Sequence, residues 1–110
     1  MDSRKKKQLE AAGWRVGPVE EFLGLDAAEA ALVEVKLGLS EALRARRMAK
    51  RLSQAQLAKR LGSSQSRVAK MEAADQSVSL DLLLRGLLVL GATPHDLAKV
   101  IRDAGARVAA

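Results

Sequence analysis

Residues 54–72 read QAQLAKRLGSSQSRVAKME, two short segments of helical pattern separated by one glycine and two serines. In the first segment Leu57 and Leu61 are four residues apart. In the second, Val68 and Met71 are three residues apart. These spacings place two apolar side chains on one face of each helix. We therefore expect all four side chains to face inward.

The connection between the two segments predicts that the helices cross closely. Ala58 is small at the point where the second helix would press on the first. Gly62 lies in the turn, where the backbone needs a positive φ and where a Cβ is expected to clash. A serine precedes each segment and can cap its N-terminus. We predict helices at 54–61 and from 65 to about 74.

Helical patterns continue on both sides of this pair. The sequence predicts a long helix from 27 to about 51, a leucine-rich helix at 80–90, and a last helix from 94 to about 105. Aromatic residues make up only 2% of the chain, so aliphatic side chains must supply the core. Strand signals are weak throughout. The predicted fold class is an all-α domain of five helices.

The N-terminal residues differ from the rest. Glycines and a proline divide residues 1–26 into short pieces, with single helical turns expected at 6–12 and 19–23. Trp14 and Phe22 are expected to anchor this arm to the helical body. The predicted organisation is therefore an arm at 1–26 and a helical domain at 27–110, which includes the close helix pair and the C-terminal helices.

The positive charge is concentrated in one segment. The 110 residues carry a net charge of +6, and nine basic residues with no acidic residue lie between positions 44 and 70. They are Arg44, Arg46, Arg47, Lys50, Arg51, Lys59, Arg60, Arg67 and Lys70. The remainder has ten basic and thirteen acidic residues, a net charge of −3. Solvated helix faces usually mix signs, so a run of one sign favours a polyanionic partner over a plain surface.

The outward side chains of the second short helix suit the major groove of DNA. The amide of Gln65 can pair with adenine N6 and N7, and Arg67 or Lys70 can reach guanine or a phosphate. Ser66 is small enough to allow close approach. Each residue alone would be read as an ordinary surface position. Together with the turn glycine and the inward aliphatic residues, they predict base-reading roles for all four.

Phosphate contacts are expected around these side chains. Gln54 and Ser64 lie at or near helix N-termini, where side chains and backbone N–H groups can hold phosphate oxygens. Lys50, Lys59 and Arg60 are predicted to contact phosphates through charge.

The motifs LSQAQLA at 52–58 and LGSSQS at 61–66 resemble those of the Xre/Cro/cI family of helix-turn-helix DNA-binding domains. This resemblance extends from residue 39 to about residue 90, about half of the chain. It implies a lambda-repressor-like bundle of five helices that binds double-stranded DNA.

The same resemblance implies roles for particular residues. Gln54 would hold a phosphate, and Gln65, Ser66 and Lys70 would face bases. Arg47 and Glu72 match a structural pair that fixes the angle between the first helix and the recognition helix. The turn after the recognition helix often contains glycine in this family, whereas here residues 73–76 read AADQ.

Short domains of this kind with an N-terminal arm are also similar to the antitoxins of HigBA-type toxin–antitoxin pairs. Such proteins repress their own operon and bind a cognate toxin. The size and layout of the chain do not separate this reading from an unpaired or phage-type repressor. A toxin-neutralising interaction module with little DNA binding of its own is a further alternative.

The leucine-rich segment at 80–90 is apolar on most sides. The last helix can cover one stripe through Leu97, Val100 and Ile101, and a second copy of the chain can cover another. We expect a homodimer through the C-terminal helices, because one helix-turn-helix unit reads few base pairs. The operator would be an inverted repeat with half-sites about 34–36 Å apart.

Other classes of function are poorly supported. The chain has no cysteine and one histidine, His95, so no catalytic residues, no metal site and no cofactor are predicted. The scarcity of aromatic residues argues against single-stranded RNA. The basic residues do not form one amphipathic helix for a membrane surface, and with no targeting segment visible a cytoplasmic, soluble protein is expected.

Overall fold

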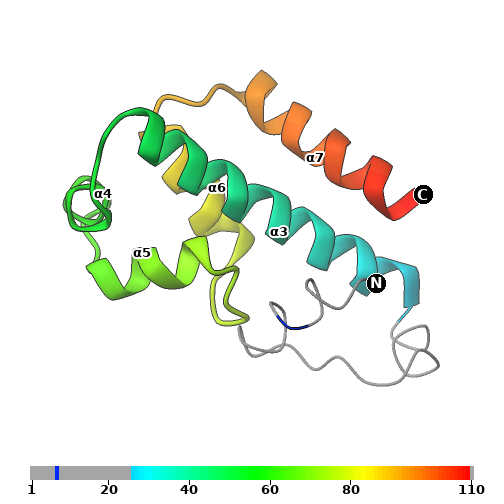
Figure 1. Cartoon of the computed structure of the whole chain (residues 1–110). Helices are drawn as coiled ribbons and strands as arrows, with labels where there is room; N and C mark the ends of the chain where they lie inside the picture. The colour runs from blue at the N-terminus through cyan, green and yellow to red at the C-terminus, as the bar shows by residue number, and fades with distance from the viewer. Residues whose placement is uncertain (1–6, 8–25, 110) are drawn as a thin grey trace.

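The computed structural model describes Lys7 and residues 26–109. Residues 26–109 form five helices and contain no strand (Figure 1), so the all-α prediction is confirmed. The helices are α3 (Asp26–Ala49), α4 (Gln54–Leu61), α5 (Gln65–Glu72), α6 (Leu80–Val89) and α7 (Pro94–Ala109). Apart from Lys7, the short pieces predicted at 6–12 and 19–23 and the anchors Trp14 and Phe22 lie outside the described residues.

The helix boundaries follow the sequence signals closely in the middle of the chain. Helix α4 has the predicted bounds, and α5 and α6 each end one or two residues earlier than predicted. The predicted end of the last helix near Gly105 is wrong, because α7 continues to Ala109. A glycine ends a helix only when the chain turns there, and Gly105 stays in the α-helix on the exposed surface.

Four of the helices end with the same backbone turn. In each case a residue one or two positions after the helix adopts the left-handed conformation, and the N–H of the residue after it bonds back to a carbonyl five residues earlier, as in a Schellman motif. The left-handed residues are Arg51 (φ 56°), Gly62 (φ 64°), Ala74 (φ 55°) and Gly91 (φ 91°). The returning bonds are Leu52 to Arg47, Ser63 to Ala58, Asp75 to Lys70, and Ala92 to Leu87.

Two of these turns bear on expectations from the sequence: the turn at Gly62 and the turn after α5, which has no glycine. A Cβ built on Gly62 would have no atom within 4 Å, so the expected clash is wrong and only the positive φ requires glycine there. After α5, Ala74 takes the left-handed position for which glycine is usually favoured. Its side chain is buried in a small cluster with Val33 and Leu37, which compensates for the less favourable backbone.

The aliphatic core lies where α3, α4, α5 and α6 meet. Its fully buried members include Leu39, Leu43, Leu57, Val68, Met71, Leu83 and Leu87. Helix α7 lies along the other side of α3 (Figure 1), with Leu97 and Val100 packed at the edge of the core. In the described part of the chain, no helix is long and apolar enough to span a membrane.

Candidate nucleic-acid interface

Helices α4 and α5 form a short paired unit joined by Gly62, Ser63 and Ser64. Leu57, Val68 and Met71 are fully buried between this pair and the rest of the domain. Leu61 is partly buried against the same core. The predicted inward face is therefore present on both helices, and it turns the opposite face of α5 toward solvent.

Side-chain caps fix where both helices begin. The hydroxyl of Ser53 accepts from the backbone N–H of Gln56 at 3.0 Å, and the Gln56 amide accepts from the N–H of Ser53 at 2.8 Å. This reciprocal pair is a capping box. At the start of α5, the hydroxyl of Ser64 accepts from the N–H of Arg67 at 3.2 Å. Ser64 therefore holds the N-terminus of α5, which is the end expected to approach DNA.

The structure places the four predicted base-reading residues together on α5. Gln65, Ser66, Arg67 and Lys70 are all exposed, and they lie within the eight residues of one helix. The hydroxyls of Ser66 and Ser64 lie 3.2 Å apart. Since no acidic residue lies in the first turn of α5, its N-terminal end presents only polar and basic groups.

The predicted phosphate-binding residues are less uniform in position. Lys59 and Arg60 are exposed in the last turn of α4, and Ser64 follows them in the connection. The ammonium of Lys50 lies elsewhere, 3.6 Å from where a Cβ on Gly91 would be. Lys50 therefore lies beside the end of α6, a position where a cation interacts favourably with the carbonyl end of a helix.

Arg47 and Glu72 join α3 to the end of α5. The Arg47 guanidinium donates through Nε to Glu72 Oε2 and through Nη2 to Glu72 Oε1 at 3.0 Å. Its Nη1 donates to the carbonyl of Leu52 at 2.7 Å. The hydrogen bond to Glu72 raises the pKa of Arg47 above its ordinary value. The side chains are only 13% and 5% exposed, so this ion pair is largely shielded from water.

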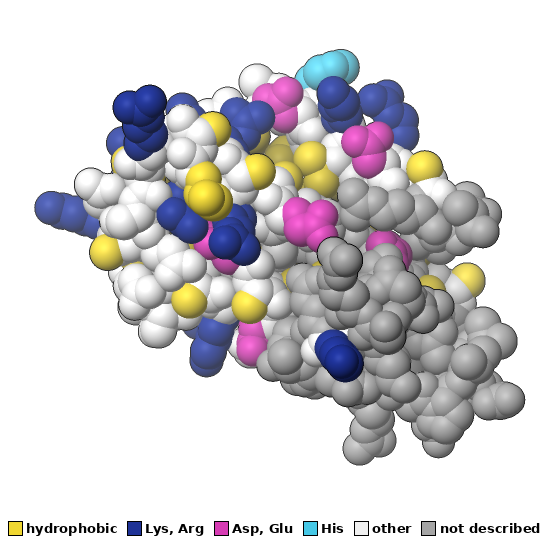
Figure 2. Space-filling view, viewed as in Figure 1, with side chains coloured by type: hydrophobic (Ala, Val, Ile, Leu, Met, Phe, Trp, Pro, Cys, Tyr) yellow, Lys and Arg dark blue, Asp and Glu magenta, His cyan; other side chains and the backbone are white. Residues whose placement is uncertain are grey.

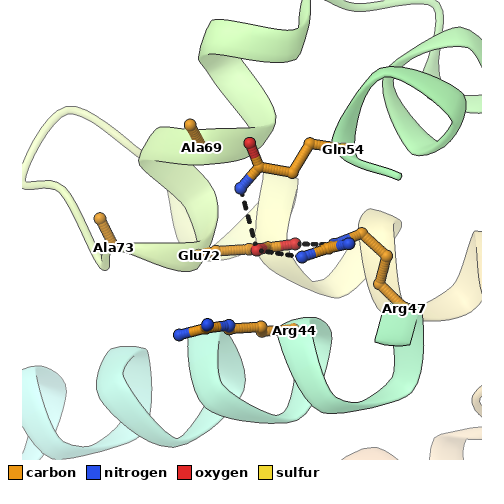
Figure 3. Close-up of a pocket in the computed structure, with 6 residues that line it drawn as sticks. All are labelled: Arg44, Arg47, Gln54, Ala69, Glu72 and Ala73. Carbon is orange, nitrogen blue, oxygen red and sulfur yellow. Dashed lines mark hydrogen bonds and ion pairs between the residues drawn. The ribbon is translucent and has the colours of Figure 1, made fainter. Parts of the chain in front are cut away.

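Gln54 extends this ion pair into a chain of polar contacts. Its Nε2 donates to Glu72 Oε1 at 3.1 Å (Figure 3). Its Oε1 accepts from Gln65 Nε2 at 2.8 Å. The chain of side chains therefore runs from Arg47 through Glu72 and Gln54 to Gln65. Sequence reasoning predicted roles for all four residues, but it did not predict that Gln54 lies between two of them.

A family model described as a helix-turn-helix domain matches residues 39–100, more than half of the chain. The chain belongs to the helix-turn-helix domain family. No curated protein and no solved structure matched the chain. The match runs from the second half of α3 into α7 and includes the whole α4–α5 unit. The family indicates DNA binding and transcriptional regulation, and it is typically non-enzymatic.

Beside its recognition helix, this helix-turn-helix domain has a hollow that sequence reasoning did not single out. Six residues line it: Arg44, Arg47, Gln54, Ala69, Glu72 and Ala73. Arg44 extends from α3 along this hollow, and Ala69 on α5 and Ala73 directly after α5 lie across it (Figure 3). Arg44 was visible in the sequence only as one of nine basic residues, because nothing in its spacing shows that α5 lies opposite.

The surface charge of the helix-turn-helix domain follows from the basic residues between positions 44 and 70. Lys and Arg side chains spread over the part of the surface formed by α4 and the neighbouring ends of α3 and α5, where few acidic side chains are visible (Figure 2). On these three helices, the side chains of Arg44, Lys59, Arg60, Arg67 and Lys70 are exposed. Within Lys7 and residues 26–109, no cluster of His, Cys, Asp or Glu could hold a metal ion.

Proposed function

We propose that this helix-turn-helix domain is a sequence-specific, double-stranded DNA-binding transcriptional repressor that inserts α5 into the major groove. The observation that carries the proposal is the exposed face of α5, on which Gln65, Ser66, Arg67 and Lys70 lie together with no competing exposed carboxylate. Amide and guanidinium groups are suited to purine edges in the major groove. Lys59, Arg60, Ser64 and Gln54 then contact the flanking phosphates.

The proposed repressor acts as a homodimer through its C-terminal helices. Leu88 and Val89, at the end of α6, are 47% and 38% exposed, and Ile101 on α7 is 42% exposed. Large aliphatic side chains exposed to this degree gain stability from burial in a partner. A two-fold dimer places two copies of α5 about one turn of duplex apart, so the operator is an inverted repeat.

The narrower proposal is an antitoxin that represses its own operon and binds a cognate toxin. It rests on the resemblance in size and layout stated above. Binding to the duplex upstream of its own gene, compared with random duplex, separates a repressor from an interaction module with little DNA binding. Purification together with the product of the neighbouring open reading frame tests the toxin partner.

The main test selects duplexes from a random pool and then measures affinity by fluorescence anisotropy over a range of salt concentrations. We expect Gln65→Ala to change the preferred sequence and Lys59→Ala to weaken all duplexes alike, with the salt slope reduced by about 1. Lys99→Ala, on α7, removes the same charge far along the chain and serves as the matched control. Failure to select any sequence, or an unchanged preference in Gln65→Ala, would overturn the proposal.

A further inference from the structure

The polar chain from Arg47 to Gln65 has a direction imposed by Glu72. An ionised carboxylate can only accept hydrogen bonds. Because Glu72 Oε1 lies 3.1 Å from the Gln54 amide, that amide must present its NH₂ group to Glu72. The oxygen of the Gln54 amide then lies on the other side, away from Glu72 (Figure 3).

The orientation of Gln54 fixes the orientation of Gln65. Gln54 Oε1 can only accept, so Gln65 must offer it an N–H, and it does so at 2.8 Å. This contact uses one of the two N–H groups on Gln65 Nε2. The second N–H and the oxygen of Gln65 remain available on the exposed side of α5. In the reverse orientation, the Gln65 oxygen would be occupied by Gln54 instead.

The groups left available on Gln65 match one base in particular. Adenine presents N7 as an acceptor and N6 as a donor in the major groove, so it needs one N–H and one oxygen from an amide. Gln65 keeps both of these groups free when its other N–H is bound to Gln54, whereas in the reverse orientation its oxygen is used by Gln54. We infer that Glu72 is a positioning residue that sets the amide orientation of Gln65 through Gln54 and thereby selects adenine. This inference rests on the proposed function.

Arg47 makes Glu72 suited to this role. Its guanidinium binds both oxygens of Glu72, which keeps the carboxylate in place at the end of α5. The side chain of Glu72 is 5% exposed, so Glu72 reaches DNA only through its neighbours. Its effect is therefore on base preference and not on general attraction to phosphates.

The first test uses Glu72→Gln in the full chain, with Asp103→Asn as the control for an equal change in charge. A neutral amide at 72 can donate as well as accept, so the hydrogen bonds from residue 72 through Gln54 to Gln65 lose their fixed direction. We expect the preference for adenine over other bases at the position read by Gln65 to fall about fivefold, the lower end of one bidentate base contact. Affinity for random duplex should match that of Asp103→Asn.

A second variant keeps the test valid if Glu72→Gln fails to fold. Gln54→Met leaves the Arg47–Glu72 ion pair intact and removes both contacts of the Gln54 amide. We expect the same loss of adenine preference, and no further loss when Glu72→Gln is added to Gln54→Met. Such non-additivity shows that Glu72 acts through Gln54.

The outcomes separate this inference from the proposed function. If the wild-type chain selects a sequence and Gln65→Ala changes it, but Gln54→Met keeps full adenine preference, the positioning role is wrong and the repressor proposal stands. An additive loss in the double variant also overturns the positioning role. If the wild-type chain selects no sequence, the proposed function itself fails.

Discussion

The two sides of α3 are packed in different ways. On one side, α5 and α6 meet α3 at Gly86, where a Cβ would lie 2.9 Å from Met71 Cε and 3.0 Å from Leu43 Cδ1. On the other side, α7 meets α3 at Gly38, where a Cβ would lie 3.6 Å from both Ala104 Cβ and Val100 Cγ1. The first contact has no spare volume, whereas the second has room for a methyl group.

Polar contacts differ in the same way. On the α5 side, the Arg47–Glu72 ion pair is largely buried and carries further hydrogen bonds. On the α7 side, Arg46 lies 3.5 Å from Asp96, and the two side chains are 34% and 41% exposed. Exposed pairs of this kind contribute little to stability. The tightly packed side therefore fixes the recognition helix, and α7 covers the domain without setting the angle of α5.

The largest effect is expected from Gly86→Ala on the tightly packed side. Leu43 and Met71 are fully buried, so neither can move away without disturbing the core. Overpacking opposes the gain in helix propensity, and we expect a net loss of about 1–2 kcal/mol in the free energy of unfolding. Urea denaturation followed by circular dichroism measures this loss.

DNA affinity provides a second readout for Gly86→Ala. Because Met71 lies on α5 directly before Glu72, displacement of Met71 should also shift the recognition helix. We expect the affinity for selected duplex to fall more than the affinity for random duplex, each compared with wild type. An unchanged urea midpoint would mean that the end of the Met71 side chain turns aside freely, and the contrast between the two sides of α3 would then be lost.

A smaller effect of opposite sign is expected from Gly38→Ala. Gly38 lies in the interior of α3, and the added methyl group would make ordinary contacts with Val100 and Ala104. Alanine is favoured over glycine in a helix by up to about 1 kcal/mol, so the variant should be more stable by about 0.5–1 kcal/mol. Its DNA affinity should not change. A destabilised Gly38→Ala protein would show that α7 packs as tightly as α6.

Local signals predicted most of the fold. Serines before α4, α5 and α6 and the glycine after α4 act within a few residues, so the sequence alone shows their roles. Ala74 could not be foreseen in the left-handed position, because its backbone is held by burial beside Val33 and Leu37 on another helix. Gly105 misled the prediction because a glycine without the returning hydrogen bonds does not end a helix.

The candidate site also has one part that the sequence predicts and one part that it does not. Exposure of Gln65, Ser66, Arg67 and Lys70 follows from the helical spacing of Val68 and Met71 on the opposite face of α5. The contacts between side chains of different helices do not follow from spacing. Gln54 was expected at a phosphate, and only the approach of α3, α4 and α5 brings its amide between Glu72 and Gln65.

The smallest effect concerns the start of α7. The backbone N–H of Thr93 donates to Asp96 Oδ2 at 2.8 Å and, with the Thr93 hydroxyl and the nearby Arg46, lowers the pKa of Asp96. A carboxyl group whose pKa is lower in the folded state stabilises the fold above its unfolded pKa of about 3.9 and loses that contribution as the pH falls through the folded pKa.

Asp96→Asn keeps an acceptor for Thr93 but cannot titrate. We therefore expect the urea midpoint of the wild type to fall slightly more than that of Asp96→Asn between about pH 6 and about pH 3. The pKa of Asp75 is also lowered, by hydrogen bonds from Ser77, but Asp75 is present in both proteins and cancels from the comparison. Equal falls in the two midpoints would show that the start of α7 adds nothing to acid stability.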